Sequence, residues 1–232
     1  MSGYRLERGG ALIARERRLG FSLDGRPFEG VAGDTLASAL MANGHAPASR
    51  VALKNGEEAA PSQIALLDGL QAVSVTDEGT LLTRALRALR RKPPDFERGN
   101  PPGVMRLCEG LALVQDHGVA PGQNVIVSCE EDDGLRAALS LHDAGVFVKA
   151  VVDTRVHPDR RLVAALAERG IRLEAGAVVA ATRGRTRLKG VDIRGFDATS
   201  GQLGPNVMRP ACDALLVPRM RRFVRPMRRR AP

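Results

Sequence analysis

The second half of this 232-residue chain alternates short apolar segments with longer amphipathic ones, and this order restricts the fold more than any other feature. Three apolar segments are typical of buried strands, namely 123–128, 146–153 and 212–218. The segments DDGLRAALSLHDAG and HPDRRLVAALAERG each show helical spacing and end at a glycine. The order strand, helix, strand predicts a parallel sheet with right-handed crossovers in a three-layer α/β unit.

Further elements are expected around these strands. Residues 104–117 show the spacing of a helix that precedes the first strand. The stretches IRLEAGAVVAATRG and RLKGVDIRGF, which follow the second amphipathic segment, predict strands joined by turns. Together they define an expected α/β domain over residues 104–218.

Residues 1–76 have a different pattern, which predicts a small α+β module. Apolar and polar residues alternate on both sides of Asp24-Gly25, a strong hairpin signal within residues 5–31. A helix over 35–42 is expected next, with Asp34 as its N-cap and Gly44 just past its end. Two strand-like pieces follow, 62–67 and 70–75. The order hairpin, helix, further strands is that of a β-grasp module.

Two segments lie outside these domains. Residues 77–103 contain a basic helical stretch and then the Pro/Gly-rich PPDFERGNPPG, so we expect a linker there. Residues 219–232 carry seven arginines, and without them the net charge falls from +9 to about +2. This arginine-rich tail is either a solvated end or a nonspecific contact for nucleic acid or an acidic partner. With one tyrosine and no tryptophan, a base-stacking platform is not expected.

The residue types offer no catalytic or metal constellation. Cys108, Cys129 and Cys212 are far apart and odd in number, so each is expected as a buried apolar side chain rather than a ligand or half of a disulfide. The four histidines have no serine, cysteine or carboxylate at a spacing typical of a triad or metal site. The chain shows no apolar segment of membrane-spanning length and no apolar signal segment, so we expect a cytoplasmic protein.

Two blocks of this sequence resemble the α subunit of heterotetrameric sarcosine oxidases and its relatives, including subunits of hydrogen cyanide synthase and opine-type amine dehydrogenases. The first block runs from Arg5 to Gly44, contains GDTLASALMANG, and continues in LLDGLQAVSV, Leu66 to Val75. The second comprises RGNPPGVMRL and HGVAPGQNVIVSCEEDDGLRAALSLHDAGVFVKAVVDTR. The resemblance implies a ferredoxin-like β-grasp module followed by a Rossmann-like α/β domain.

The departures from that family concern its cofactors. Some relatives hold a [2Fe-2S] cluster in the first module, but four thiolates are needed and this chain has no cysteine before Cys108. The family's G-x-G-x-x-G flavin loop and its folate-binding half are both absent from the sequence. The flavin domain is thus internally deleted, and we expect FAD on a partner subunit.

The second block resembles the family's nicotinamide-dinucleotide domain, which implies a nucleotide at the carboxyl ends of the strands. Asp153 ends the second strand, where a ribose-binding acid is expected, and Ser128 ends the first; both are candidate NAD-binding residues. The loop Glu130–Asp133 either stabilises a helix start or belongs to a weakened site, since its four carboxylates repel a diphosphate.

Three functional hypotheses follow. The first is an accessory, non-catalytic subunit of a sarcosine-oxidase-like flavin-dependent amine oxidoreductase, docked to a flavin-bearing subunit through the β-grasp module. The second is an NAD-binding component of such an oxidoreductase that uses Asp153. The third is a non-enzymatic binding protein whose arginine-rich tail contacts nucleic acid or an acidic partner. A folded deletion relic without a role is a further alternative.

Overall fold

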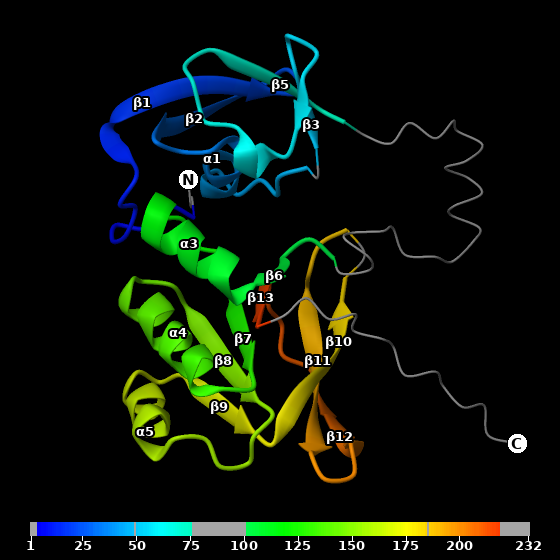
Figure 1. Ribbon diagram of the computed structural model, residues 1–232. Coiled ribbons are helices and arrows are strands. Elements are labelled where there is room, and N and C mark those ends of the chain that lie inside the picture. Colours follow the sequence, from blue (N-terminus) through cyan, green and yellow to red (C-terminus); the bar gives the residue numbers. More distant parts are fainter. Residues whose placement is uncertain (1–3, 49, 76–100, 185, 219–232) are drawn as a thin grey trace, which may run out of the picture. The chain divides into compact units, whose positions relative to one another are not determined.

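The computed structural model of the chain describes residues 4–48, 50–75, 101–184 and 186–218 (Figure 1). By their contacts the residues fall into two compact units: Met1–Pro94 with Ala112–Pro121, and Asp95–Leu111 with Gly122–Pro232. The boundary passes through helix α3 (Leu107–His117). The expected linker helix and the arginine-rich tail lie outside the described residues.

The first unit is built on a five-stranded sheet of order β2-β1-β5-β3-β4. Strands β1 (Ala14–Leu23) and β2 (Arg26–Ala32) form the predicted antiparallel hairpin. Asp24 and Gly25 at its turn both have positive φ, 52° and 76°, as a tight hairpin turn of this kind requires. Strand β5 (Leu70–Ser74) lies parallel to β1 and antiparallel to β3 (Val51–Leu53), which confirms the β-grasp order.

Helix α1 (Leu36–Ala42) supplies the core of this unit. Leu36 and Leu40 are fully buried against Phe21 of β1 and Val51 of β3. The expected N-cap was Asp34, but the cap is Thr35, whose hydroxyl accepts from the backbone N–H of Ser38 in a capping box. The helix ends as predicted: Asn43 is the C-cap residue, and Gly44 follows with φ 75°.

The expected strand over 62–67 is wrong. Residues Pro61–Gln63 form a single 3-10 turn, and only Ala65 makes an isolated bridge, to Thr35. The sheet is instead completed by β3 and β4 (Glu58–Ala59), which pair across the Asn55-Gly56 turn. Strands of three and two residues are too short to leave a period-two pattern, which explains why the sequence did not reveal them.

The second unit contains an all-parallel sheet of order β6-β13-β7-β8-β9. The predicted apolar segments became its three central strands, which are almost entirely buried: β13 (Ala214–Val217), β7 (Val125–Cys129) and β8 (Val148–Asp153). The outer strands are β6 (Val104–Arg106) and β9 (Arg172–Ala175). The start of the expected 104–117 helix is therefore a strand, and α3 begins only at Leu107.

The two faces of this sheet are covered differently (Figure 1). Helices α4 (Asp132–Asp143) and α5 (Arg160–Glu168) connect successive strands on one face, as the strand–helix order predicts. The other face carries an antiparallel sheet of β10 (Ala177–Arg183), β11 (Gly190–Asp197) and β12 (Gln202–Met208). Its Val179, Val191 and Ile193 share one buried core with Ile126 and Leu215 of the parallel sheet. The third layer of the expected three-layer α/β unit is therefore a second sheet in the described residues.

Within the expected α/β domain, the contact-based units divide the chain at residues 112–121. Residues 112–121 join the first unit, although the sequence suggested one domain over 104–218. The N-terminal segment explains the difference, because the N–H groups of Leu6 and Leu12 donate to the carbonyls of Gly118 and Asp116. In return the N–H of Ala120 donates to the carbonyl of Tyr4.

Candidate functional site

The carboxyl edge of the parallel sheet brings the sequence-predicted residues together. Cys129, the last residue of β7, lies directly beside Asp153, the last residue of β8, in the parallel register. Ser128 lies one position earlier and pairs with Val152. Ligands of open α/β sheets bind at this edge, so the predicted residues occupy the expected place.

The carboxylate of Asp153 is fully buried and its oxygens are already in use. One oxygen accepts from the backbone N–H of Arg155 at 2.8 Å and from its Nε at 3.1 Å. The other accepts from Arg155 Nη2 at 2.8 Å and lies 3.6 Å from the thiol sulfur of Cys129. Asp153 is 0% exposed, so its carboxylate makes no contact with solvent. A ribose hydroxyl therefore finds no vacant acceptor on this carboxylate while Arg155 holds it.

Arg155 also reaches the adjacent helix. Its Nη1 donates to Asp132 at the first position of α4 over 2.7 Å, so one guanidinium bridges the end of β8 and the start of α4. These hydrogen bonds raise the pKa of Arg155 above its ordinary value, with Asp153 as the main cause. Nearby, burial raises the pKa of the Cys129 thiol, and the Asp153 carboxylate adds to that effect.

The loop from β7 to α4 has the length of a dinucleotide-binding loop but other side chains. In C-E-E-D-D-G, the residue at the third glycine position of G-x-G-x-x-G is Gly134. A Cβ on Gly134 would lie 2.1 Å from the Cβ of Cys129, so glycine there serves the close packing of helix on strand. The first two glycine positions are Cys129 and Glu131. This spacing was a signal in the sequence that the prediction missed.

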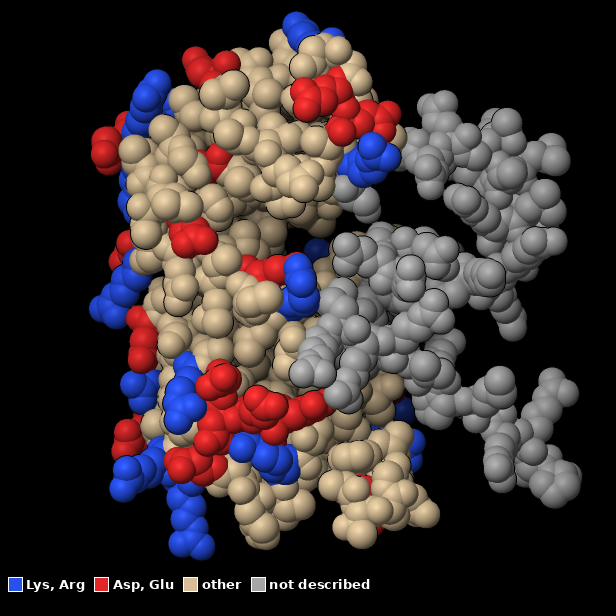
Figure 2. All heavy atoms as spheres, viewed as in Figure 1, with Lys and Arg blue, Asp and Glu red and all other residues tan. Residues whose placement is uncertain are grey.

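A diphosphate does not fit the residues present. Close approach to the start of α4 requires a bare backbone, but Glu131 is the N-cap residue, and Asp132 and Asp133 fill the first turn. Acidic side chains gather over the part of the surface that the second unit forms, with arginines and lysines beside them (Figure 2). The acids stabilise the start of the helix through its dipole, whereas the same charges repel a phosphate.

The first unit contains a second place to test, the segment after α1. A [2Fe-2S] cluster needs four thiolate ligands, and residues 16–62 contain no cysteine. His45, the one histidine there, packs edge-on against Phe28 with ring centroids 5.0 Å apart. No group of three or more histidine, cysteine or acidic residues that could hold a metal ion occurs in the described part of the chain. The residues present do not fit an iron–sulfur cluster.

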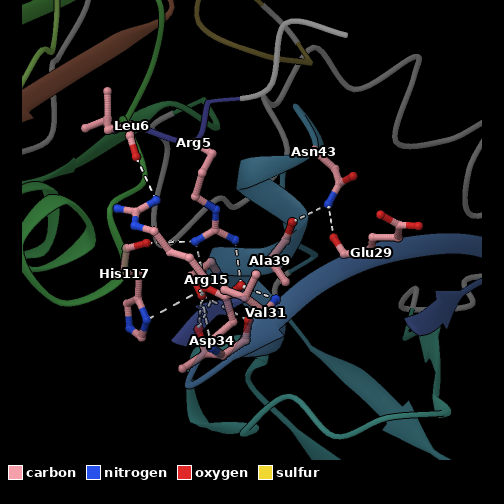
Figure 3. A network of polar contacts seen from close by, with 11 residues as sticks. Arg5, Leu6, Arg15, Glu29, Val31, Asp34, Ala39, Asn43 and His117 are labelled. Carbon is pink, nitrogen blue, oxygen red and sulfur yellow. Dashed lines mark hydrogen bonds and ion pairs between the residues drawn. The ribbon is translucent and has the colours of Figure 1, made fainter. Parts of the chain in front are cut away.

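Asp34 is instead the centre of a buried polar network (Figure 3). Its carboxylate accepts from both terminal nitrogens of Arg5, at 3.1 and 2.6 Å, from the backbone N–H of Val31 at 3.0 Å, and from the hydroxyl of Ser38 at 2.8 Å. Arg5 also donates to the carbonyl of His117, whose Nδ1 lies 4.0 Å from Asp34. The network ties the N-terminal segment to α1 and to the end of α3.

A second contact in the same region holds α1 on the hairpin. The side-chain amide of Asn43 donates to the carbonyls of Glu29 and Ala39, at 2.7 and 2.8 Å (Figure 3). Both networks hold α1 in place, one against the N-terminal segment and the other against the hairpin. Within the described residues, no helix is long and apolar enough to cross a membrane.

Comparison with known proteins finds relatives for the first unit, and they agree with its β-grasp fold. A family model described as a 2Fe-2S iron-sulfur cluster binding domain matches residues 16–62. Sarcosine oxidase subunit alpha of Rhizobium meliloti (strain 1021) is 59% identical over 44 residues, which are 19% of this chain and 4% of that protein. Over this segment the chain is similar to a sarcosine oxidase alpha subunit. The match spans only a small part of the length of this relative.

Solved structures extend the comparison to the fold. The crystal structure of L-proline dehydrogenase from P. horikoshii matches with a TM-score of 0.51 at 12% identity, over 93% of this chain and 61% of that chain. Thioredoxin reductase from T. acidophilum matches over 40% of this chain and 30% of that chain, at 19% identity and a TM-score of 0.32. The likeness to L-proline dehydrogenase supports the ferredoxin-like and parallel-sheet architecture of the chain.

Proposed function

We propose that this chain is an accessory, non-catalytic subunit of a sarcosine-oxidase-like, flavin-dependent amine oxidoreductase complex. One observation carries the proposal: the fold of a cluster-binding domain is kept over residues 16–62, and none of the ligands of the cluster is present. A scaffold without its cofactor chemistry acts through its surface. The relative that it matches is named as one subunit of an enzyme.

The flavin belongs to a partner in this proposal. The β7–α4 loop does not fit a diphosphate, so FAD bound by a second subunit supplies the redox chemistry. The role of this chain is to bind and orient that subunit.

The proposal places the docking surface on the β-grasp module. Leu12, Leu67 and Val73 are large apolar side chains that are exposed in the first unit. Val73 follows the buried Ala72 on β5, so it lies on the face of the sheet opposite the core. In this proposal Val73 is one of the residues that contact the partner subunit.

The test is purification of the tagged full-length chain from its own cells, followed by an absorption spectrum and identification of co-purified chains. The expected result is a yellow complex that contains a flavin-bearing subunit. Val73→Glu should lose that subunit, whereas Val207→Glu, at an exposed apolar position of β12 in the second unit, should retain it. A colourless chain that purifies alone would refute the accessory role.

The two other hypotheses give different results in the same material. NAD binding at Asp153 would appear as a saturable rise in melting temperature with NAD, lost in Asp153→Ala; the hydrogen bonds of that carboxylate to Arg155 count against it. Contact of residues 219–232 with nucleic acid would appear as binding that falls steeply with salt and disappears when the tail is removed.

A further inference from the structure

The guanidinium of Arg155 lies where strand β8, the β7–α4 loop and helix α4 meet. We propose that the Arg155 side chain occupies the place that a dinucleotide would take at this edge. It bridges the acid at the end of β8 to the acid at the start of α4, so that this edge binds no dinucleotide. The proposal concerns the second unit alone and does not depend on the accessory role.

The bonding of Arg155 is that of an internal ligand. It makes three hydrogen bonds to Asp153 and one to Asp132, all between 2.7 and 3.1 Å. In a dinucleotide site of this fold, the acid that ends the second strand binds a ribose, and the adjacent helix start binds the diphosphate. One side chain therefore engages both of the groups that a dinucleotide would engage.

The backbone around Arg155 is fixed as well, so the side chain is held in place from several sides. The N–H of Thr154 donates to the carbonyl of Cys129 at 3.2 Å. The carbonyl of Arg155 accepts from the N–H of Gly176 at 2.9 Å. These bonds connect the residue to β7 on one side and to the β9–β10 turn on the other. With the backbone fixed by these bonds, the ion pairs cost only the rotamer entropy of the side chain.

The charges of the edge explain why an arginine is needed. Asp153 has no exposed area, and a buried carboxylate without a cation is strongly unfavourable. Asp132 adds a second negative charge 2.7 Å from the same guanidinium. The neighbouring Asp133 has its own partner, Arg136, at 3.3 Å. Arg155 is thus the cation that compensates the buried acid, a role that a diphosphate with its own negative charge could not take.

The first experiment uses the three cysteines of the full-length chain as local reporters. Cys129 touches Asp153, Cys212 lies in the core of the same unit, and Cys108 is exposed. Labelling with a thiol reagent, resolved by peptide mass spectrometry, gives one rate for each cysteine. In Arg155→Ala we expect Cys129 to be labelled about tenfold to a hundredfold faster, the factor for losing a charge-assisted hydrogen bond in local opening. Cys212 and Cys108 should keep their rates.

A matched control variant tests whether any lost ion pair has this effect. Arg169 of the same unit makes a comparable two-point pair with Asp143, at 2.8 and 3.1 Å, and its side chain is as exposed as that of Arg155 at 32%. Asp143 is half exposed, whereas Asp153 is buried. Arg169→Ala should therefore leave the labelling rate of Cys129 unchanged. Equal effects of the two variants would overturn the proposal.

The second experiment measures dinucleotide binding directly. Isothermal titration of the full-length chain with NAD, and with ADP alone, should give no saturable heat. A saturable signal with the unaltered chain would overturn the proposal. If Arg155→Ala does not fold, Asp132→Asn replaces it, because that variant removes the charge at α4 and leaves Asp153 paired. Asp132→Asn should then accelerate labelling of Cys129 less than tenfold but more than Arg169→Ala, and a rate equal to that of Arg169→Ala would count against the bridge.

Discussion

In the Asp34→Ala variant, the first unit should unfold at a much lower denaturant concentration than in the native chain. Asp34 has no exposed side-chain area, and its carboxylate accepts four hydrogen bonds, two of them from Arg5. The replacement leaves a guanidinium that is only 23% exposed without its anion, and it leaves the Val31 N–H and the Ser38 hydroxyl without this acceptor.

The size of the effect follows from these contacts. Removing one partner of a buried ion pair costs about 3–5 kcal/mol, because the remaining charge stays buried. Arg5 keeps its 2.7 Å hydrogen bond to the carbonyl of His117 and is partly solvated, so we expect the lower end, about 3 kcal/mol. Since domains are stable by only about 5–15 kcal/mol, this is a large share of the free energy of unfolding.

The fluorescence of the single tyrosine is a suitable assay. Tyr4 belongs to the first unit, where its N–H donates to the carbonyl of Ala42 at the end of α1, and the chain has no tryptophan to mask its signal. Urea titration followed by this signal should show a lower midpoint for Asp34→Ala with an unchanged slope.

The control is Glu29→Ala, which removes a pair of the same unit that lies in solvent. Arg18 and Glu29 are 3.4 Å apart, and their side chains are more than two thirds exposed. Such a pair contributes about 0–1 kcal/mol. If Asp34→Ala changed the urea midpoint no more than Glu29→Ala does, the network around Asp34 would not stabilise the first unit as we describe.

Three further predictions concern the second unit. Burial raises the pKa of Cys212 to about 12 and also raises that of Cys129. The unfolded chain loses these protons from about pH 9, whereas the folded chain retains them. The free energy of unfolding should therefore fall as pH rises from 9 to 12, by up to about 1.4 kcal/mol per pH unit for each thiol. Urea titrations at several pH values in that range should show that the free energy of unfolding falls less steeply with pH in Cys212→Ala than in the native chain. Gly134→Ala should cost about 1–3 kcal/mol in the same titration, because its Cβ would overlap that of Cys129, while Gly195→Ala, with its nearest atom at 4.0 Å, should cost less. Asp159→Ala should reduce amide protection in the first turn of α5, because backbone hydrogen bonds to this N-cap lower its pKa; the effect should be full above pH 3.8 and disappear as pH falls through the lower folded pKa.

The parts of the fold that could be predicted are those with a local signal. The Asp24-Gly25 turn, α1 and the buried strands each carry their pattern within a few residues, and the structure confirms them. The short strands β3 and β4 and the exposed edge strand β12 have too few alternating residues to show one. The cap at Thr35 was assigned one position early because Asp34 is an equally good cap by residue type, and its partner Arg5 is 29 residues away.

The candidate site shows the same division between local and distant information. The position of Asp153 at the carboxyl edge followed from the strand pattern alone. Its partner could not be predicted, since the bridge from Arg155 to Asp132 depends on how β7 and β8 are aligned and on where α4 begins. The C-E-E-D-D-G spacing was visible, but only the contact between Gly134 and Cys129 shows that one of the three glycine positions is kept for packing.

A cofactor contributes to the stability of the protein that binds it, because a ligand of the folded state raises the free energy of unfolding. A chain that loses its cofactor must replace that contribution with contacts of its own or become marginal. In each unit a partly exposed arginine pairs with a fully buried carboxylate: Arg5 with Asp34 beside α1, and Arg155 with Asp153 at the carboxyl edge of the parallel sheet. Both arginines approach from outside the elements that they join, as a ligand would. Their stabilisation requires neither iron nor nucleotide, so each unit holds this part of its fold together with its own side chains.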